Sequence, residues 1–174
     1  MIATSPPEKE ITILSLPCGY ARDLIGVFED IKDRNVRAYG LDLDEKAVEV
    51  ASSRAKELGI EKICFHLGNA LNPMDYPIQS PDIIVSIGLT EYLSYEEIIE
   101  FYKQLHSALG EDGHLLTAHC GHHPHEKSYG EDTGWVVNSL DKREVQELFS
   151  QLPFSDVNIW HEPEEIYSMI LARK

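Results

Sequence analysis

The chain has 174 residues, 43% of them hydrophobic and 26% charged, which is the composition of one ordinary globular domain. Its formal net charge of −15 argues against nucleic acid and anionic membrane surfaces as partners, because both are bound through clustered Lys and Arg. No apolar run approaches the length of a membrane span, the first ten residues do not resemble a signal peptide, and the three cysteines form no C-x-x-C pair, so we expect a cytoplasmic protein without disulfides.

Short apolar runs alternate with segments of helical periodicity along the chain. We expect residues 1–10 to be a flexible lead-in and residues 11–174 to form one domain. Strands are predicted at 11–16, 36–43, 62–67, 82–87, 114–119, 156–160 and 165–173. Helices are predicted at 21–31, 45–58, 95–109 and 142–152. Their expected capping residues are Asp44 with Gly59, Ser94 with Glu97, and Asp141 with Glu144.

This alternation predicts an α/β fold with a single doubly wound, mainly parallel, Rossmann-like sheet of seven strands. The last two strands are expected to form an antiparallel pair, because the short segment between them leaves no room for a crossover helix. Ligands of such sheets bind beyond the carboxyl ends of the strands, where the strand order reverses. The residues that follow the first four strands are therefore the candidate site.

The first of these turns, Pro17 to Arg22, contains small residues. Cys18, Gly19 and Ala21 allow a backbone to approach a ligand closely. The free N–H groups at the start of the next helix suit a carboxylate or a phosphate. A tight turn that uses its glycine for packing is the structural alternative.

Polar residues follow the second and third strands. Asp42 lies 23 residues after the single glycine of the first loop, where an acid can accept hydrogen bonds from both hydroxyls of a ribose. A strand-end turn is the alternative for Asp42. Asn69 and Ala70 can contact an adenine edge, with Leu43 and Leu71 as apolar walls. A plain turn explains this second segment equally well.

The segment "IGLTEYL" follows the fourth strand and lies over the same edge of the predicted sheet. It contains Ile87, Gly88, Leu89, Thr90, Glu91 and Tyr92. A purely structural interpretation makes Gly88 a tight turn and Tyr92 a core aromatic.

Together these four segments resemble the class I S-adenosylmethionine-dependent methyltransferases, over nearly the whole chain. The family's acid-x-Gly-x-Gly pattern falls on Ser15 to Ala21. Cys18 and Gly19 match its common form, whereas Ser15 replaces the acid and Ala21 replaces the last glycine. Asp42 matches the family's ribose-binding acid.

Two further segments carry the resemblance. Asn69 stands where the family more commonly has Asp, and "GLTEYL" is similar to the GL-x-D-Y-L signature of a branch of small-molecule methyltransferases whose first loop is similarly altered. That branch keeps a Trp early in the final helical region, a position that Trp135 would match. The single-glycine loop then looks like a subfamily variant.

The resemblance implies that S-adenosylmethionine is the cofactor, S-adenosylhomocysteine its product, and a small molecule the methyl acceptor. Carried over residue by residue, the implied cofactor-binding set is Pro17, Cys18, Gly19, Ala21, Asp42, Leu43, Asn69, Ala70, Ile87, Gly88 and Leu89.

In-line methyl transfer needs alignment of acceptor, methyl group and sulfur more than it needs a base. His119 is the first candidate base, because it ends the fifth strand at the same edge, and Glu91 and Tyr92 come next. A structural role is the alternative for His119. The acceptor pocket is expected from residues 72–80, 89–95 and 120–138, where Tyr76, Tyr92, Tyr129 and Trp135 would supply aromatic walls, or from a second subunit in a homodimer.

The segment after the fifth strand is rich in potential metal ligands, namely His119, Cys120, His122, His123 and His125. Their spacing matches no standard zinc pattern, so we expect no metal and favour a substrate-facing loop. Metal binding and plainly solvated histidines are the alternatives.

Two other functions remain open. A non-catalytic methyltransferase-like binding protein is favoured by the altered first loop and opposed by Asp42 and Asn69. An NAD(P)-dependent oxidoreductase is less favoured, since its G-x-G-x-x-G pattern is met only at Gly19 and the chain contains no second mononucleotide half.

Overall fold

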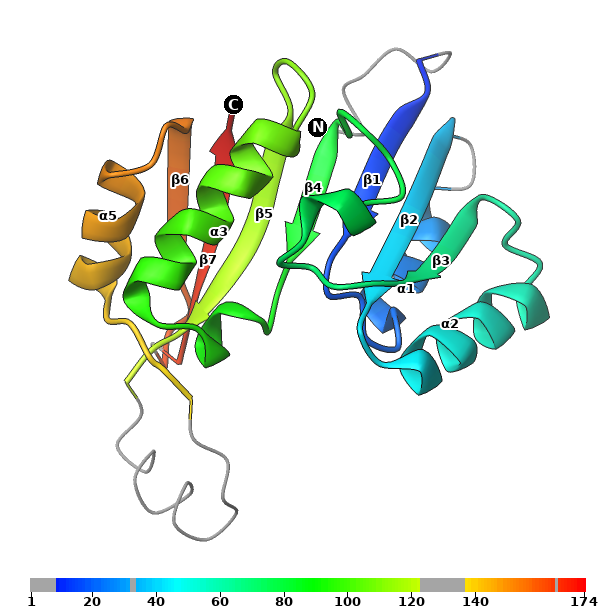
Figure 1. Ribbon diagram of the computed structural model, residues 1–174, viewed down its shortest axis with the longest axis horizontal. Coiled ribbons are helices and arrows are strands. Elements are labelled where there is room, and N and C mark those ends of the chain that lie inside the picture. The colour runs from blue at the N-terminus through cyan, green and yellow to red at the C-terminus, as the bar shows by residue number, and fades with distance from the viewer. Residues whose placement is uncertain (1–8, 32–33, 123–136, 165) are drawn as a thin grey trace, which may run out of the picture.

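The computed structural model describes residues 9–31, 34–122, 137–164 and 166–174. They form one seven-stranded sheet in the order β3-β2-β1-β4-β5-β7-β6 (Figure 1). The strands are β1 (Ile11–Ser15), β2 (Val36–Asp42), β3 (Ile63–Leu67), β4 (Ile83–Ser86), β5 (His114–Cys120), β6 (Ser155–His161) and β7 (Tyr167–Arg173). The first five strands pair in parallel, and β7 is antiparallel to both of its neighbours. The predicted α/β fold and its antiparallel C-terminal pair are confirmed.

The helices begin and end close to the predicted residues. They are α1 (Arg22–Asp30), α2 (Glu45–Glu57), α3 (Tyr95–Ala108) and α5 (Lys142–Ser150), with 3-10 turns η2 (Pro73–Asp75) and η3 (Thr90–Tyr92). The side chain of Asp44 accepts a hydrogen bond from the backbone of Lys46, and both expected capping boxes form. None of the helices in the described ranges is long and apolar enough to cross a membrane.

Each face of the sheet carries its own core. On one face α3 and α5 pack over β1, β4, β5 and β7, with Phe101, Tyr102 and Phe149 among the buried side chains (Figure 1). On the other face, Leu24 and Ile25 of α1 and two alanines of α2 pack against β1, β2 and β3. β1 pairs with β2 on one side and with β4 on the other, so the strand order reverses between β1 and β4. Ligands of doubly wound sheets bind at that reversal.

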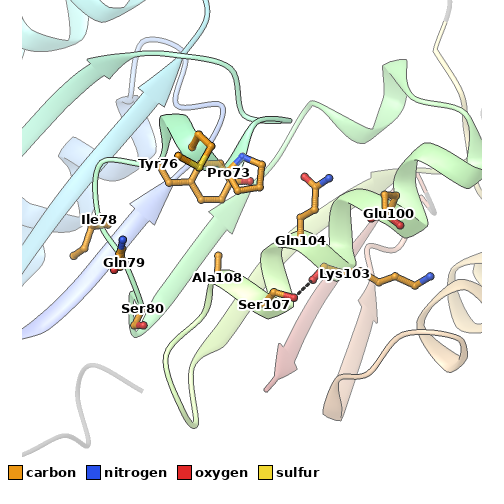
Figure 2. Close-up of a pocket in the computed structure, with 11 residues that line it drawn as sticks. Pro73, Tyr76, Ile78, Gln79, Ser80, Glu100, Lys103, Gln104, Ser107 and Ala108 are labelled. Carbon is orange, nitrogen blue, oxygen red and sulfur yellow. Dashed lines mark hydrogen bonds between the residues drawn. The ribbon is translucent and has the colours of Figure 1, made fainter.

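The connection from β3 to β4 contains no helix longer than η2. Between it and α3 lies a groove of about 550 Å³, lined by Pro73, Met74, Tyr76, Ile78, Gln79, Ser80, Glu100, Lys103, Gln104, Ser107 and Ala108 (Figure 2). We call it the α3 groove. Six of its lining residues, Tyr76 among them, belong to the segment 72–80 that the sequence predicts for the acceptor pocket, and none is a predicted cofactor-binding or catalytic residue.

Glycine at position 40 of β2 is required by packing. A Cβ there would lie 2.5 Å from the ring of Phe65 and 2.9 Å from the Sγ of Cys18 in the first loop. We expect Gly40→Ala to lower the free energy of unfolding by about 1–3 kcal/mol, measured by urea denaturation, since overpacking displaces both neighbours.

Gly26→Ala provides the matched control. A Cβ at Gly26, inside α1, would meet nothing within 4 Å, so the same substitution should stabilise the protein by roughly 0.5–1 kcal/mol through helix propensity. Equal effects of the two substitutions would contradict the packing argument.

Candidate functional site

The loop after β1 is held by backbone hydrogen bonds to both neighbouring strands. Leu16 N donates to the carbonyl of Val85 in β4, and Cys18 N donates to the carbonyl of Leu41 in β2, each at 2.9 Å. Gly19 has a φ of 49°. Ala21 has a φ of 51°, so alanine takes the left-handed conformation at the position where the sequence pattern replaces a glycine.

Asp42 joins this loop to the end of β2. One carboxylate oxygen accepts a hydrogen bond of 2.7 Å from Gly19 N, and the other accepts one of 3.0 Å from Asp44 N. A carboxylate has about four acceptor sites, so two remain for a ligand. The structure thus brings together Gly19 and Asp42, the glycine and the acid that the sequence predicts at one cofactor site.

A cavity of about 380 Å³ opens at this edge, between the ends of β1, β2 and β4. It is lined by Ser15, Pro17, Cys18, Gly19, Asp23, Asp42, Val85, Ile87 and Gly88, and we call it the edge cavity. Six of these residues belong to the predicted cofactor-binding set. A Cβ added at Gly19 or Gly88 would meet no atom within 4 Å, so the backbone at both positions borders open space.

Two polar residues that line the edge cavity, Ser15 and Asp23, are not in the predicted cofactor-binding set. Asp23 lies in the first turn of α1, where an acid is equally expected from the helix dipole, so its position carried no separate signal. Ser15 was noticed only as the replacement for the family's acid.

The Asn69–Ala70 segment lies next to the edge cavity without lining it. Gly68 N donates to the backbone carbonyl of Asp42, which places the start of this segment beside β2. The side-chain oxygen of Asn69 accepts from Leu71 N at 2.9 Å, and Tyr76 donates to the carbonyl of Ala70 at 2.8 Å. Hydrogen bonds within residues 69–76 therefore hold the backbone of this turn without a ligand.

The residues after β4 divide between the core and the surface. Gly88 has a φ of 83°, which turns the chain into η3. Leu89 packs against the core, and Glu91 is buried, with 7% of its surface exposed. Burial raises the pKa of the Glu91 carboxyl. Tyr92 is 55% exposed, so the alternative of a core aromatic is wrong for this residue.

His119 is buried, with 1% of its surface exposed, and both ring nitrogens have partners. Its Nε2 lies 2.8 Å from the hydroxyl of Tyr102 in α3, and its Nδ1 lies 3.4 Å from the hydroxyl of Thr90 in η3. Burial lowers the pKa of His119 to about 4. This placement favours the structural alternative, and a role as base stays a prediction.

The hydrogen bonds around His119 have one consistent direction. Thr117 donates to the carbonyl of Ser86 at 2.6 Å, so its hydroxyl oxygen accepts from Tyr102 at 2.9 Å. Tyr102, having donated its only proton, accepts from Nε2–H of His119. The Nδ1 of His119 then accepts from Thr90. This chain of hydrogen bonds ties η3 to β5, α3 and β4.

The histidine-rich segment lies partly outside the described residues. His122 is described: its Nδ1 lies 3.0 Å from the Ser139 hydroxyl and its Nε2 3.5 Å from Glu144. His123, His125, Tyr129 and Trp135 fall outside the described ranges. Within those ranges, no three His, Cys, Asp or Glu residues gather as a metal ion would require.

Comparisons with known proteins agree with this geometry. The profile of a family described as "methyltransferase domain" matches residues 7–167. A Bacillus subtilis (strain 168) protein described as "uncharacterized methyltransferase YcgJ" is 26% identical over 181 residues, covering 98% of this chain and 68% of the relative.

Solved structures share the fold. The CurJ carbon methyltransferase has a TM-score of 0.81 at 13% identity, covering 99% of this chain and 50% of that one. The magnesium protoporphyrin IX methyltransferase of Synechocystis, solved with bound S-adenosylhomocysteine, has a TM-score of 0.71 at 13% identity, covering 94% of this chain and 74% of that one. The chain spans between 50% and 61% of the length of three of the solved structures that it matches.

The buried state of His119 predicts a pH dependence of stability. Its ordinary pKa is 6.5 and its pKa in the folded chain is about 4, so between these values the unfolded chain binds a proton that the folded chain does not. The free energy of unfolding should therefore fall as pH decreases from 6.5 to 4, by up to about 3 kcal/mol from this group.

Urea denaturation from pH 7 to 4.5 measures this effect as the difference between variants. His119→Gln should lose less stability over that range than the wild type. His66→Gln, at an exposed position of β3, should lose as much as the wild type. Equal pH slopes for all three proteins would contradict the assignment.

Proposed function

The chain belongs to the methyltransferase domain family, and from that premise we propose that it transfers a methyl group from S-adenosylmethionine to a small-molecule acceptor. The observation that carries the proposal is the edge cavity, in which Gly19, Asp42 and Gly88 meet at the reversal of strand order. When bound, S-adenosylmethionine supplies an already activated methyl group on a sulfonium.

The residues of the edge cavity fit this cofactor. The open space beside Gly19 and Gly88 admits a ligand against the backbone. Asp42 keeps acceptor sites for the two ribose hydroxyls, and Leu43 and Ala70, which follow β2 and β3, would flank the adenine. Relatives in fold that were solved with S-adenosylhomocysteine support the assignment.

The chain's own contribution to catalysis would be alignment. A well-oriented pair of reactants can reach effective molarities of about 10⁵–10⁸ M without a base. The turn at Gly88 and the hydrogen-bonded position of Thr90 fix the segment that would face the acceptor. An acceptor that must lose a proton needs a base, and Glu91 suits this role better than His119, because both ring nitrogens of His119 already have partners and burial raises the pKa of Glu91.

Cofactor binding is the first test. Isothermal titration calorimetry with S-adenosylmethionine and S-adenosylhomocysteine should show binding, and Asp42→Asn should weaken both by about tenfold or more, since it removes charge and one acceptor oxygen.

Asp44→Asn is the matched control, because it removes the same charge two residues away while an amide can still cap α2. Its affinities should equal those of the wild type. Unchanged binding by Asp42→Asn would remove Asp42 from the site. No binding by the folded wild type would favour the non-catalytic alternative.

The role of Glu91 can be tested once an acceptor has been found with methyl-labelled donor. Glu91→Gln should lower kcat by about 10²–10⁴ while leaving the affinity for S-adenosylhomocysteine unchanged, if the acceptor must be deprotonated. Tyr92→Phe, the neighbouring change, should affect kcat less. A wild-type kcat in Glu91→Gln would show that Glu91 is not the base.

A further inference from the structure

The short turn η3 depends on other elements for its position. Two backbone hydrogen bonds shape it: Tyr92 N donates to the carbonyl of Leu89 at 3.0 Å, and Leu93 N donates to the carbonyl of Thr90 at 3.2 Å. A single turn of 3-10 helix has poor hydrogen-bond geometry and little stability of its own. Contacts with other parts of the chain therefore decide where η3 lies on the sheet.

Asn138 makes two such contacts. Its backbone N–H donates to the carbonyl of Glu91 at 2.7 Å, and its side-chain Nδ2 donates to the carbonyl of Leu93 at 2.8 Å. Asparagine suits this position because its short side chain carries a neutral N–H donor, which an aspartate lacks. Two residues further on, Leu140 N donates to the carbonyl of Cys120. Asn138 therefore joins the end of η3 to the end of β5.

His119 contacts η3 at its other end. The Nδ1 of His119 lies 3.4 Å from the hydroxyl of Thr90, the first residue of η3. Thr90 and Leu93 are both buried, with 2% and 7% of their surfaces exposed. The turn is therefore tied at its start by a side chain of β5 and at its end by Asn138, and Glu91 lies between the two ties.

The burial of the Glu91 carboxyl follows from where η3 lies. Burial is the cause that raises its pKa. The charge of Glu91 acts on Tyr102 of α3 and on Tyr167 of β7, and burial raises the pKa of both tyrosines, so both are neutral where a carboxyl titrates. His119 of β5 is neutral above its pKa of about 4, and Glu162 is the other carboxylate that acts on Tyr167. A movement of η3 toward solvent would hydrate the Glu91 carboxyl.

We propose that Asn138 is a positioning residue, which keeps the Glu91 carboxyl buried at the carboxyl edge of the sheet by holding the end of η3. The use of that carboxyl as a base rests on the proposed function, whereas its placement by Asn138 does not. Without the side-chain amide, the backbone hydrogen bond at Glu91 is left to hold this end alone. The turn then opens more often, and water reaches the carboxyl.

The first test uses the ligand-free protein. Asn138→Ala should speed the amide hydrogen exchange of Tyr92 and Leu93, measured by NMR, by about two- to tenfold, the net worth of one hydrogen bond. The pKa of Glu91, followed by the NMR shift of its carboxyl carbon and assigned with Glu91→Gln, should fall toward its ordinary value of 4.5. The amides of β5 should keep their exchange rates, which separates this effect from a general loss of stability.

Asn158→Ala is the matched control. It removes the same side chain, whose Nδ2 also donates to a backbone carbonyl, that of Asp156, at an exposed position of β6. It should leave the exchange of η3 and the pKa of Glu91 unchanged. Wild-type exchange and a wild-type Glu91 pKa in Asn138→Ala would overturn the proposal, with or without a known ligand.

A second test asks whether Asn138 acts through Glu91 in catalysis, once an acceptor has been found with methyl-labelled donor. Asn138→Ala should lower kcat by about two- to tenfold, keep the wild-type affinity for S-adenosylhomocysteine, and have no further effect on kcat in Glu91→Gln. An equal loss in the Glu91→Gln background would show that Asn138 does not act through Glu91. If the folded wild type binds no S-adenosylmethionine, the proposed function fails, and the exchange and pKa results still decide whether Asn138 holds η3.

Discussion

The hydrogen bond between Gly19 N and the Asp42 carboxylate is the contact on which the site depends. It joins the loop after β1 to the end of β2 across 23 residues of chain, at 2.7 Å. Backbone bonds from Leu16 to β4 and from Cys18 to β2 hold the same loop from both sides. The edge cavity is therefore bordered by fixed backbone, and a ligand would meet a site that needs little rearrangement. The Asp42 carboxylate therefore stabilises the loop after β1 in addition to any role in binding a ligand.

The loop after β1 contains two residues with left-handed φ although its sequence offers one glycine. Ala21 takes a left-handed φ of 51°, at a cost of about 1–2 kcal/mol relative to an ordinary conformation. Its N–H donates to the carbonyl of Cys18, and its own carbonyl accepts from Ile25 in α1. These bonds and the burial of its methyl group offset the strain. Alanine therefore occupies this left-handed position at an energetic cost that its neighbours offset.

Local signals explain why so much of the fold could be predicted. Each cap at Asp44, Ser94 and Asp141 acts within a few residues, so sequence alone locates the helix starts. Gly19 and Asp42 could be paired because parallel strands end at a common edge. The hydrogen-bonded chain through Tyr102 and His119 could not be predicted, since it depends on how α3 packs over β5. A turn at Asn69 was one of the two alternatives open from the sequence, but its hydrogen-bond partners could not be predicted, because loop geometry sets them.

Asp23 shows why an uncompensated charge at this edge is tolerable. The edge cavity opens to solvent, where a carboxylate keeps most of its hydration, and the N-terminal end of α1 lies beside it. None of the described residues that line the cavity is Lys, Arg or His, and the two acids cost little while water solvates them. A ligand that displaces this water must donate hydrogen bonds to the carboxylates in its place, which hydroxyl, amide N–H and ammonium groups can all do.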